Sequence, residues 1–210
     1  MSLSLINIAK KFNRDWVFQN ANYKFEIPGT YVIQGPNGSG KSTFLKILSG
    51  FLTPTEGELK LQINSKHIAI ENWSNHISYA SPYYELIEEM CLEEFVSFYI
   101  KFKPLQKGIS HHDLIKIAYL EGAKDKQIKN FSSGMKQRLK LALAWLSDVS
   151  VVLLDEPCSN LDAKGIEWYK NLANEYSKNK LIIVCSNDIN DEFFFCENII
   201  DMNKFIKISS

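Results

Sequence analysis

The sequence predicts an α/β fold that has a mainly parallel sheet, an N-terminal antiparallel β layer and a helical insertion subdomain. From residue 131 onward, short β-branched apolar segments alternate with segments of helical periodicity, and this alternation is typical of a parallel sheet. Residues 83–130 differ, because they combine helical periodicity with many Glu and Lys side chains. A chain of 210 residues suffices for one hydrophobic core. We therefore expect a single domain over 1–210, with a core of about 1–82 and 131–210 and a helical subdomain of about 83–130.

The first elements are expected to be strands. The segments LSLINIA and ANYKFEI predict the small antiparallel layer, and TYVIQ predicts the first strand of the main sheet. A helix over about 41–49 should end at Gly50, since glycine commonly ends helices. The segment TPTEGEL predicts a turn into another strand.

The second half should alternate helices and strands. In order, we expect a helix in GMKQRLKLALAWL, a strand in VSVVLLD, a helix over about 163–178, a strand in KLIIVCS and a helix over about 189–196. The last segment, ENIIDMNKFIKIS, predicts a final pair of short strands.

Charge and apolar patterning exclude several classes of protein. The 24 Lys and Arg residues balance 24 Asp and Glu residues, so no strong field attracts nucleic acid and we expect no such partner. No segment approaches the roughly 18 apolar residues of a membrane span, and the N-terminal residues lack the apolar run of a signal peptide. None of the four cysteines forms a CxxC spacing, which favours a reduced cytoplasmic chain.

A glycine-rich loop follows the strand TYVIQ and opens the next helix. Its residues fit G-x-x-x-x-G-K-[ST] at every fixed position, and this pattern places converging backbone N–H groups and a helix N-terminus around phosphate. Lys41 should bridge the β- and γ-phosphates, and the Ser42 hydroxyl should bind Mg²⁺. The expected ATP-binding residues of this phosphate loop are Gly35, Pro36, Asn37, Gly38, Ser39, Gly40, Lys41, Ser42 and Thr43.

A second motif is the apolar strand VVLL that ends in Asp155 and Glu156. Acids at the carboxyl end of a buried strand lie where α/β sheets bind ligands. Asp155 should hold Mg²⁺ through water, and Glu156 should act as the general base toward the attacking water. The alternative, a solvated acidic turn after a core strand, is weakened by the phosphate loop upstream.

Two further segments carry a resemblance to a known family. The segment FSSGM at 131–135, shortly before the acidic strand, resembles the LSGGQ signature of ABC ATPases, and SNLD at 159–162 resembles their D-loop. The order and spacing of the motifs match over essentially the whole chain. The chain thus resembles an ABC transporter ATP-binding subunit, a member of the P-loop NTPase superfamily.

The resemblance implies that two such domains pair head to tail, with each ATP between one phosphate loop and the opposite signature. The signature residues expected at the partner's γ-phosphate are Ser132, Ser133 and Gly134. The family also places an aromatic ring against adenine. Phe12 lies at the matching distance before the phosphate loop and Trp16 is the second choice, although either ring could belong to the core instead.

Three places depart from the family pattern. The signature has Ser133 for its first Gly and Met135 for its Gln, changes that members of the family often tolerate. Where the family has a Gln that contacts Mg²⁺ and water, this chain has Ser81 or Pro82, and Ser81 could still reach the metal through water. Where the family has its switch His, this chain has Asn187, which can hydrogen-bond phosphate but cannot carry a proton or a positive charge. We expect the changes at these last two places to slow hydrolysis without abolishing it, because Glu156 is retained.

The resemblance implies an ATPase, with Mg²⁺ and ATP, that drives a separate integral membrane permease from the cytoplasmic face of the membrane. A second ABC ATPase subunit, most simply another copy of this chain, should complete the ATP sites. An aromatic and apolar cluster could meet the permease or pack the insertion on itself; it comprises Tyr83, Tyr84, Leu86, Ile87 and Met90. The alternatives are an ABC ATPase that transports nothing and a slowly hydrolysing, nucleotide-gated regulator.

Overall fold

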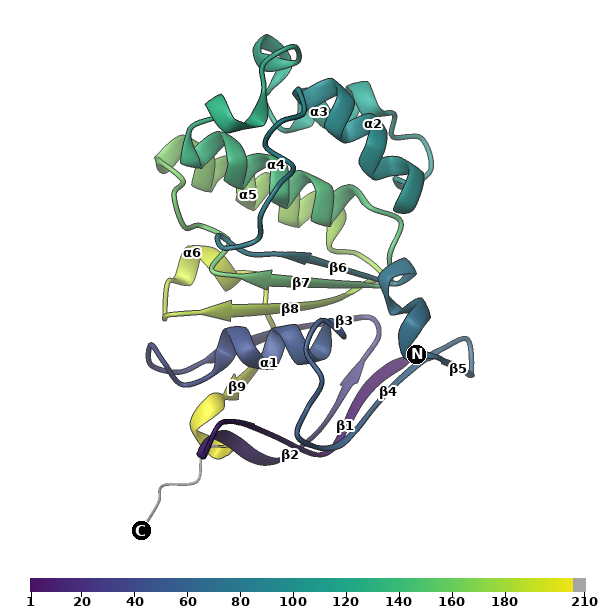
Figure 1. The fold of residues 1–210 in the computed structure, drawn as a ribbon, viewed down its shortest axis with the longest axis vertical. Coiled ribbons are helices and arrows are strands. Elements are labelled where there is room, and N and C mark those ends of the chain that lie inside the picture. Colours follow the sequence, from purple (N-terminus) through teal and green to yellow (C-terminus); the bar gives the residue numbers. More distant parts are fainter. Residues whose placement is uncertain (206–210) are drawn as a thin grey trace.

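The computed structural model describes residues 1–205 and arranges them around two sheets of different kinds (Figure 1). One sheet has five strands in the order β6-β7-β8-β3-β9, and every pairing in it is parallel. The other has four antiparallel strands in the order β2-β1-β4-β5. The predicted fold class is confirmed.

The parallel sheet is covered on both faces. Alternate residues of a strand point to opposite faces, and in β7 Val152 and Leu154 join one core cluster while Val151 and Leu153 join the other. All of these side chains are buried, as expected for a parallel sheet between two layers. The strands are β3 (Gly29–Gln34), β6 (Ile77–Ala80), β7 (Val151–Asp155), β8 (Leu181–Ser186) and β9 (Asn198–Asp201).

Helices cover each face of this sheet. Helix α1 (Lys41–Leu48) lies between the parallel sheet and the antiparallel sheet and shares one core with both. Helices α4 (Ser133–Leu146) and α5 (Ala163–Tyr176) pack on the opposite face and share the second core. The sheet therefore presents the carboxyl ends of its strands at an edge between two helical layers.

The antiparallel sheet depends on a glycine in β4. Its strands are β1 (Ser2–Phe12), β2 (Asp15–Glu26), β4 (Glu56–Ile63) and β5 (Lys66–Ile68). The pairing of β1 with β4 shifts register between Ile6 and Ala9, where Gly57 adopts φ +91° and a Cβ would lie 2.5 Å from the carbonyl oxygens of Ile6 and Asn7. Only glycine fits this close backbone approach.

The insertion contains two helices, α2 (Leu92–Phe102) and α3 (His111–Ile117), and two short 3₁₀ helices, Glu121–Ala123 and Ile128–Asn130. Figure 1 shows α2 and α3 beside α4, on the side away from the antiparallel sheet. Their buried apolar residues belong to the same core as those of α4. Within residues 1–205, no helix combines the length and apolar character needed to cross a membrane.

The C-terminal prediction is wrong in part. Strand β9 forms, but Met202–Phe205 is a 3₁₀ helix and not the second strand of a pair. The Asp201 carboxylate accepts the Asn203 N–H at 2.9 Å, which turns the chain, and Phe205 stacks on Phe44 with ring centroids 5.8 Å apart. The rest of that predicted strand lies outside the described residues. Helix α6 is also shorter than expected, spanning Asn190–Phe193.

Candidate functional site

The phosphate loop joins β3 to α1 and is shaped by its glycines. Gly40 adopts φ +93°, and a Cβ there would lie 2.4 Å from Val17 Cγ1, so a larger residue would clash with the Val17 side chain. Gly40 is also the N-cap of α1 and provides no side-chain cap, which leaves the first N–H groups of the helix available to an anion. Lys41 Nζ donates to the carbonyls of Gly35 at 2.6 Å and Pro36 at 3.1 Å. The loop thus places the Lys41 ammonium next to backbone N–H groups that are free to bind an anion.

Asp155 ends β7 next to α1 and has a buried carboxylate. Its Oδ2 accepts a 3.4 Å hydrogen bond from the Tyr79 hydroxyl, whereas Oδ1 is buried and has no partner among residues 1–205. Burial raises the pKa of Asp155 and the nearby Glu156 charge adds to this, while the Ser42 hydroxyl opposes it. An unpaired carboxylate oxygen beside a serine hydroxyl suits a hard divalent cation, so Ser42 and Asp155 fit Mg²⁺.

Glu156 is held from two sides. Its Oε1 accepts a hydrogen bond from Asn187 Nδ2 at 2.6 Å, and its Oε2 accepts one from the Ser159 hydroxyl at 3.3 Å. Its backbone adopts φ +44°, which is rare for a residue with a side chain, and its N–H donates to Cys185 O at 2.9 Å. Strained backbone of this kind persists where surrounding contacts fix it. The carboxylate is therefore fixed between the segment after β7 and the segment after β8.

Asn187 sits where the resemblance expects a switch histidine. Its Nδ2 group contacts Glu156, and its Oδ1 is buried and unpaired within the described part of the chain. Because an amide oxygen accepts hydrogen bonds, this atom can accept one from a water beside Glu156.

Phe12, the ring predicted to stack on adenine, and the phosphate loop line the same cavity of about 330 Å³. Phe12 lines it and is 49% exposed. Trp16 is not among the lining residues. Each ring has a lysine over it, with Lys10 Nζ 5.1 Å from the Phe12 ring and Lys11 Nζ 5.1 Å from the Trp16 ring. The other residues that line the cavity are Val17, Asn37, Gly38, Gly40, Lys41, Ser42, Thr43 and Glu156.

The signature residues lie at the start of α4, apart from the residues that line this cavity. Ser132 and Ser133 are exposed and Gly134 is half-buried. Ser132 is the N-cap, and its hydroxyl accepts the Met135 N–H at 3.2 Å. Within one chain, the fold thus brings together the phosphate loop, Asp155, Glu156 and Asn187 but leaves the signature facing outward.

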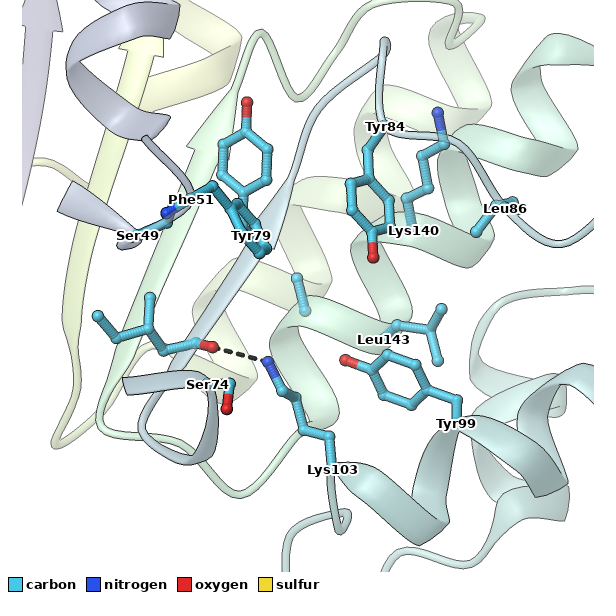
Figure 2. A pocket seen from close by; sticks show the side chains of 12 residues that line it. Ser49, Phe51, Ser74, Tyr79, Tyr84, Leu86, Tyr99, Lys103, Lys140 and Leu143 are labelled. Atoms are coloured by element: carbon cyan, nitrogen blue, oxygen red, sulfur yellow. Dashed lines mark hydrogen bonds between the residues drawn. The ribbon is translucent and has the colours of Figure 1, made fainter. Parts of the chain in front are cut away.

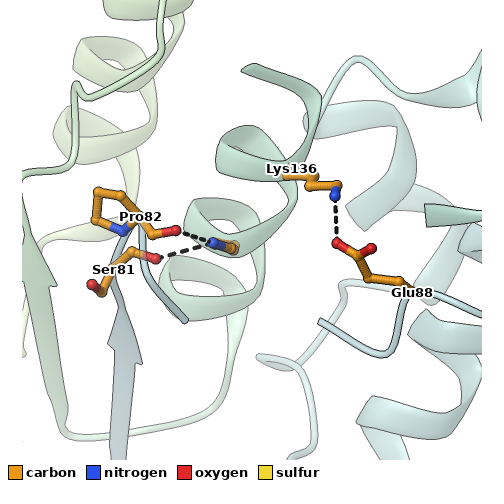
Figure 3. A network of polar contacts seen from close by, with 5 residues as sticks. Ser81, Pro82, Glu88 and Lys136 are labelled. Carbon is orange, nitrogen blue, oxygen red and sulfur yellow. Dashed lines mark hydrogen bonds and ion pairs between the residues drawn. The ribbon is translucent and has the colours of Figure 1, made fainter. Parts of the chain in front are cut away.

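The segment after β6 is attached to α4 by a buried lysine. Lys140 Nζ donates to the carbonyls of Ser81 at 3.2 Å and Pro82 at 2.7 Å, and nearby Lys136 pairs with Glu88 (Figure 3). Burial lowers the pKa of Lys140. The Ser81 hydroxyl accepts the Tyr83 N–H at 3.3 Å, so the predicted metal contact of Ser81 remains a prediction.

Sequence reasoning missed three residues of the site. Tyr79 reaches Asp155 from the buried strand β6, Ser159 reaches Glu156, and Lys140 fixes the segment after β6. Ser159 carried a usable signal, because it opens the D-loop resemblance. Tyr79 and Lys140 carried none, since a tyrosine in a strand and a lysine in a helix are ordinary.

Comparison with known proteins identifies the family. A family model described as ABC transporter matches residues 18–159. The uncharacterized ABC transporter ATP-binding protein YybJ of Bacillus subtilis (strain 168) is 31% identical over 208 residues, which cover 96% of this chain and 92% of YybJ. The lantibiotic transport ATP-binding protein SrtF of Streptococcus pyogenes is 28% identical over 209 residues, covering 97% and 86% of the two chains.

A solved structure agrees with both relatives. The dimeric, post-hydrolysis ATP-binding cassette MJ0796, bound to ADP and Pi, superimposes with a TM-score of 0.80 at 26% identity and covers 95% of this chain and 93% of its own. The family model, the two relatives and the solved structure all point to the same family. This chain belongs to the ABC transporter family, as an ABC ATPase nucleotide-binding domain.

Proposed function

We propose that this chain is the ATP-hydrolysing subunit of an ABC transporter, and that two copies close head to tail around Mg-ATP and drive a separate membrane permease. The observation that carries the proposal is the position of Glu156. Its carboxylate lines the phosphate-loop cavity and is held there by Asn187 and Ser159. A fixed carboxylate beside a phosphate site suits a general base.

We assign ATP binding to residues in and around the phosphate-loop cavity. The N-terminal N–H groups of α1 and the Lys41 ammonium bind the phosphates, and the Phe12 ring stacks on adenine. Ser42 and Asp155 hold Mg²⁺, which when bound neutralises charge on the phosphate oxygens. The unpaired Oδ1 of Asp155 supports this assignment.

Hydrolysis is assigned to Glu156 with help from Asn187. Glu156 accepts a proton from the attacking water, and Asn187 orients that water through its unpaired Oδ1. An amide stays neutral, so Asn187 cannot offer the positive charge of an imidazolium to the γ-phosphate. We therefore propose slow but measurable turnover; the absence of any turnover would favour a nucleotide-gated regulator instead.

The outward position of the signature supports the proposed dimer. Ser132, Ser133 and Gly134 begin a helix of 14 residues, where backbone N–H groups and the helix dipole favour an anion. We assign these residues to the γ-phosphate held by the partner subunit. The dimeric state of MJ0796 supports this assignment.

The permease is assigned to a hollow between β6 and the insertion (Figure 2). The rings of Phe51, Tyr79 and Tyr84 lie 5.9 to 6.5 Å apart along it, and Tyr83, 80% exposed, lies in the next hollow along the same surface. Exposed aromatic rings are enriched in the cores of protein interfaces. Bound to the permease in this way, the chain would lie on the cytoplasmic face of the membrane.

The first test is a capture experiment with tagged Glu156→Gln protein. This variant should close around Mg-ATP and stay closed, and an integral membrane protein from detergent-solubilised membranes of its own cells should be enriched with it. The matched control is a Lys41→Ala, Glu156→Gln double variant, which should show no Mg-ATP-dependent closure. Ribosomes, DNA or no partner on a confirmed ATP-bound dimer would argue against transport, and undiminished hydrolysis by Glu156→Gln would refute the general-base role.

A further inference from the structure

A second carboxylate lies buried beneath Glu156. Glu192, in α6, is 0% exposed. Its Oε1 accepts the backbone N–H of Cys158 at 3.1 Å, and its Oε2 accepts the Ser186 hydroxyl. Its own carbonyl accepts the Tyr169 hydroxyl of α5 at 2.7 Å. The side chain thus has a donor on each oxygen and a fixed backbone.

The two donors precede the two residues that hold Glu156. Cys158 comes one residue before Ser159, and Ser186 comes one residue before Asn187. Glu156 therefore joins the segment after β7 to the segment after β8 at the cavity, and Glu192 joins the same two segments one residue earlier, inside the protein. The Ser186 hydroxyl also accepts the Ile189 N–H at 3.2 Å, which fixes its orientation.

Packing alone does not account for a carboxylate in this position. Burial raises the pKa of Glu192 to about 7, with Glu156 and Asp155 adding to the shift and the donors Ser186 and Cys158 opposing it. The nearby Lys170 ammonium forms its ion pair with the neighbouring Asp191, at 2.7 Å between Nζ and Oδ1. Apolar residues of similar volume often replace buried charged groups without loss of stability, so the contacts of this carboxylate indicate a role in geometry.

We propose that Glu192 is a positioning residue for ATP hydrolysis, which couples the D-loop at 159–162 to the segment at 186–187 so that Ser159 and Asn187 hold Glu156 together. The inference rests on the proposed hydrolysis. It implies that a shift of the D-loop, which the proposed second subunit would contact, is transmitted to Asn187.

The test measures kcat and the KM for ATP separately in four variants. Glu192→Ala removes both acceptors and should lower kcat about tenfold, with KM within about twofold of the unmodified chain. Glu192→Gln should recover most of kcat, because its amide oxygen can accept the Cys158 N–H while its NH₂ group donates to Ser186. Ser186→Ala keeps the carboxylate and should lower kcat about threefold. Asp191→Asn, which neutralises the adjacent half-buried carboxylate paired with Lys170, should leave both parameters unchanged.

Combining the variants separates coupling from folding. A Glu192→Ala, Ser186→Ala double variant should be no slower than Glu192→Ala alone, since the two side chains act through one contact. An unchanged kcat in Glu192→Ala, or a parallel loss of kcat, ATP affinity and melting temperature in both Glu192→Ala and Ser186→Ala, would overturn the inference alone. Absence of turnover in the unmodified chain would overturn the proposed hydrolysis, and the inference with it.

Discussion

The nucleotide-binding half of the site and its coupling half differ in how far they keep the family pattern. The phosphate loop and the acidic end of β7 match at every fixed position, and their side chains meet around one cavity. At the end of β6 and after β8, where the resemblance leads us to expect a Gln and a His, this chain carries Ser81, Pro82 and Asn187. Three sets of hydrogen bonds surround these positions. The Tyr79 hydroxyl donates to Asp155, Lys140 Nζ donates to the carbonyls of Ser81 and Pro82, and the Asn187 amide donates to Glu156. If the proposed function holds, we expect nucleotide binding to follow the family pattern and turnover to depart from it.

The strongest challenge to this comparison is Asn187→His. An imidazole at this position can carry a proton and a positive charge toward the γ-phosphate, so we expect kcat to rise about tenfold while the KM for ATP stays within about twofold. Steady-state phosphate release measures both. Equal turnover with and without the substitution would mean that position 187 does not limit the rate.

The partner surface is challenged by a Tyr83→Ala, Tyr84→Ala double variant. We expect capture of the membrane protein to weaken about tenfold, which corresponds to about 1.4 kcal/mol for the two truncated rings together, while ATP binding is retained. Tyr119→Ala is the matched control, since Tyr119 is an exposed tyrosine of the insertion outside this hollow. Loss of ATP binding together with capture would show that the pair packs the insertion.

The binding half is tested by Phe12→Ala. Loss of a ring that stacks on a base should raise the KM for ATP about fivefold with little change in kcat. Trp16→Ala should change neither, because Trp16 is not among the residues that line the cavity. The reverse result would assign the stacking to Trp16 and leave Phe12 as a packing residue.

The smallest expected effect is that of Tyr79→Phe. Removing one hydroxyl that donates to Asp155 should raise the Mg²⁺ concentration for half-maximal activity about threefold, as expected for a single hydrogen bond. Tyr84→Phe, a second hydroxyl of the same aromatic cluster, should leave the Mg²⁺ requirement unchanged. An equal effect of both substitutions would place the change in the cluster and not at the metal site.

The parts predicted best from sequence are those with a strong local pattern. The apolar runs of β7 and β8 and the loop of residues 35–43 show their structure in consecutive residues, and strand and helix positions follow closely. Contacts between distant segments were not predictable in this way. The bond from Lys140 to Ser81 spans 59 positions and that from Tyr79 to Asp155 spans 76, so only the assembled fold brings these atoms together. The C-terminal error has a local cause, because the Asp201 carboxylate accepts the Asn203 N–H and turns the chain where a second strand was predicted.

Helix α4 carries a signature at one end and a restraint near its middle. Lys140 lies seven residues after Ser133, about 10 Å along the axis at the rise of an α-helix. Any force that displaces the carbonyls of Ser81 and Pro82 must either break two hydrogen bonds to a buried ammonium or move the helix as a rigid rod. A permease that pressed on the hollow beside Tyr84 would therefore displace α4 as a rigid body. This displacement would move Ser132, at the other end of the helix, relative to the ATP site of the other subunit in the proposed dimer.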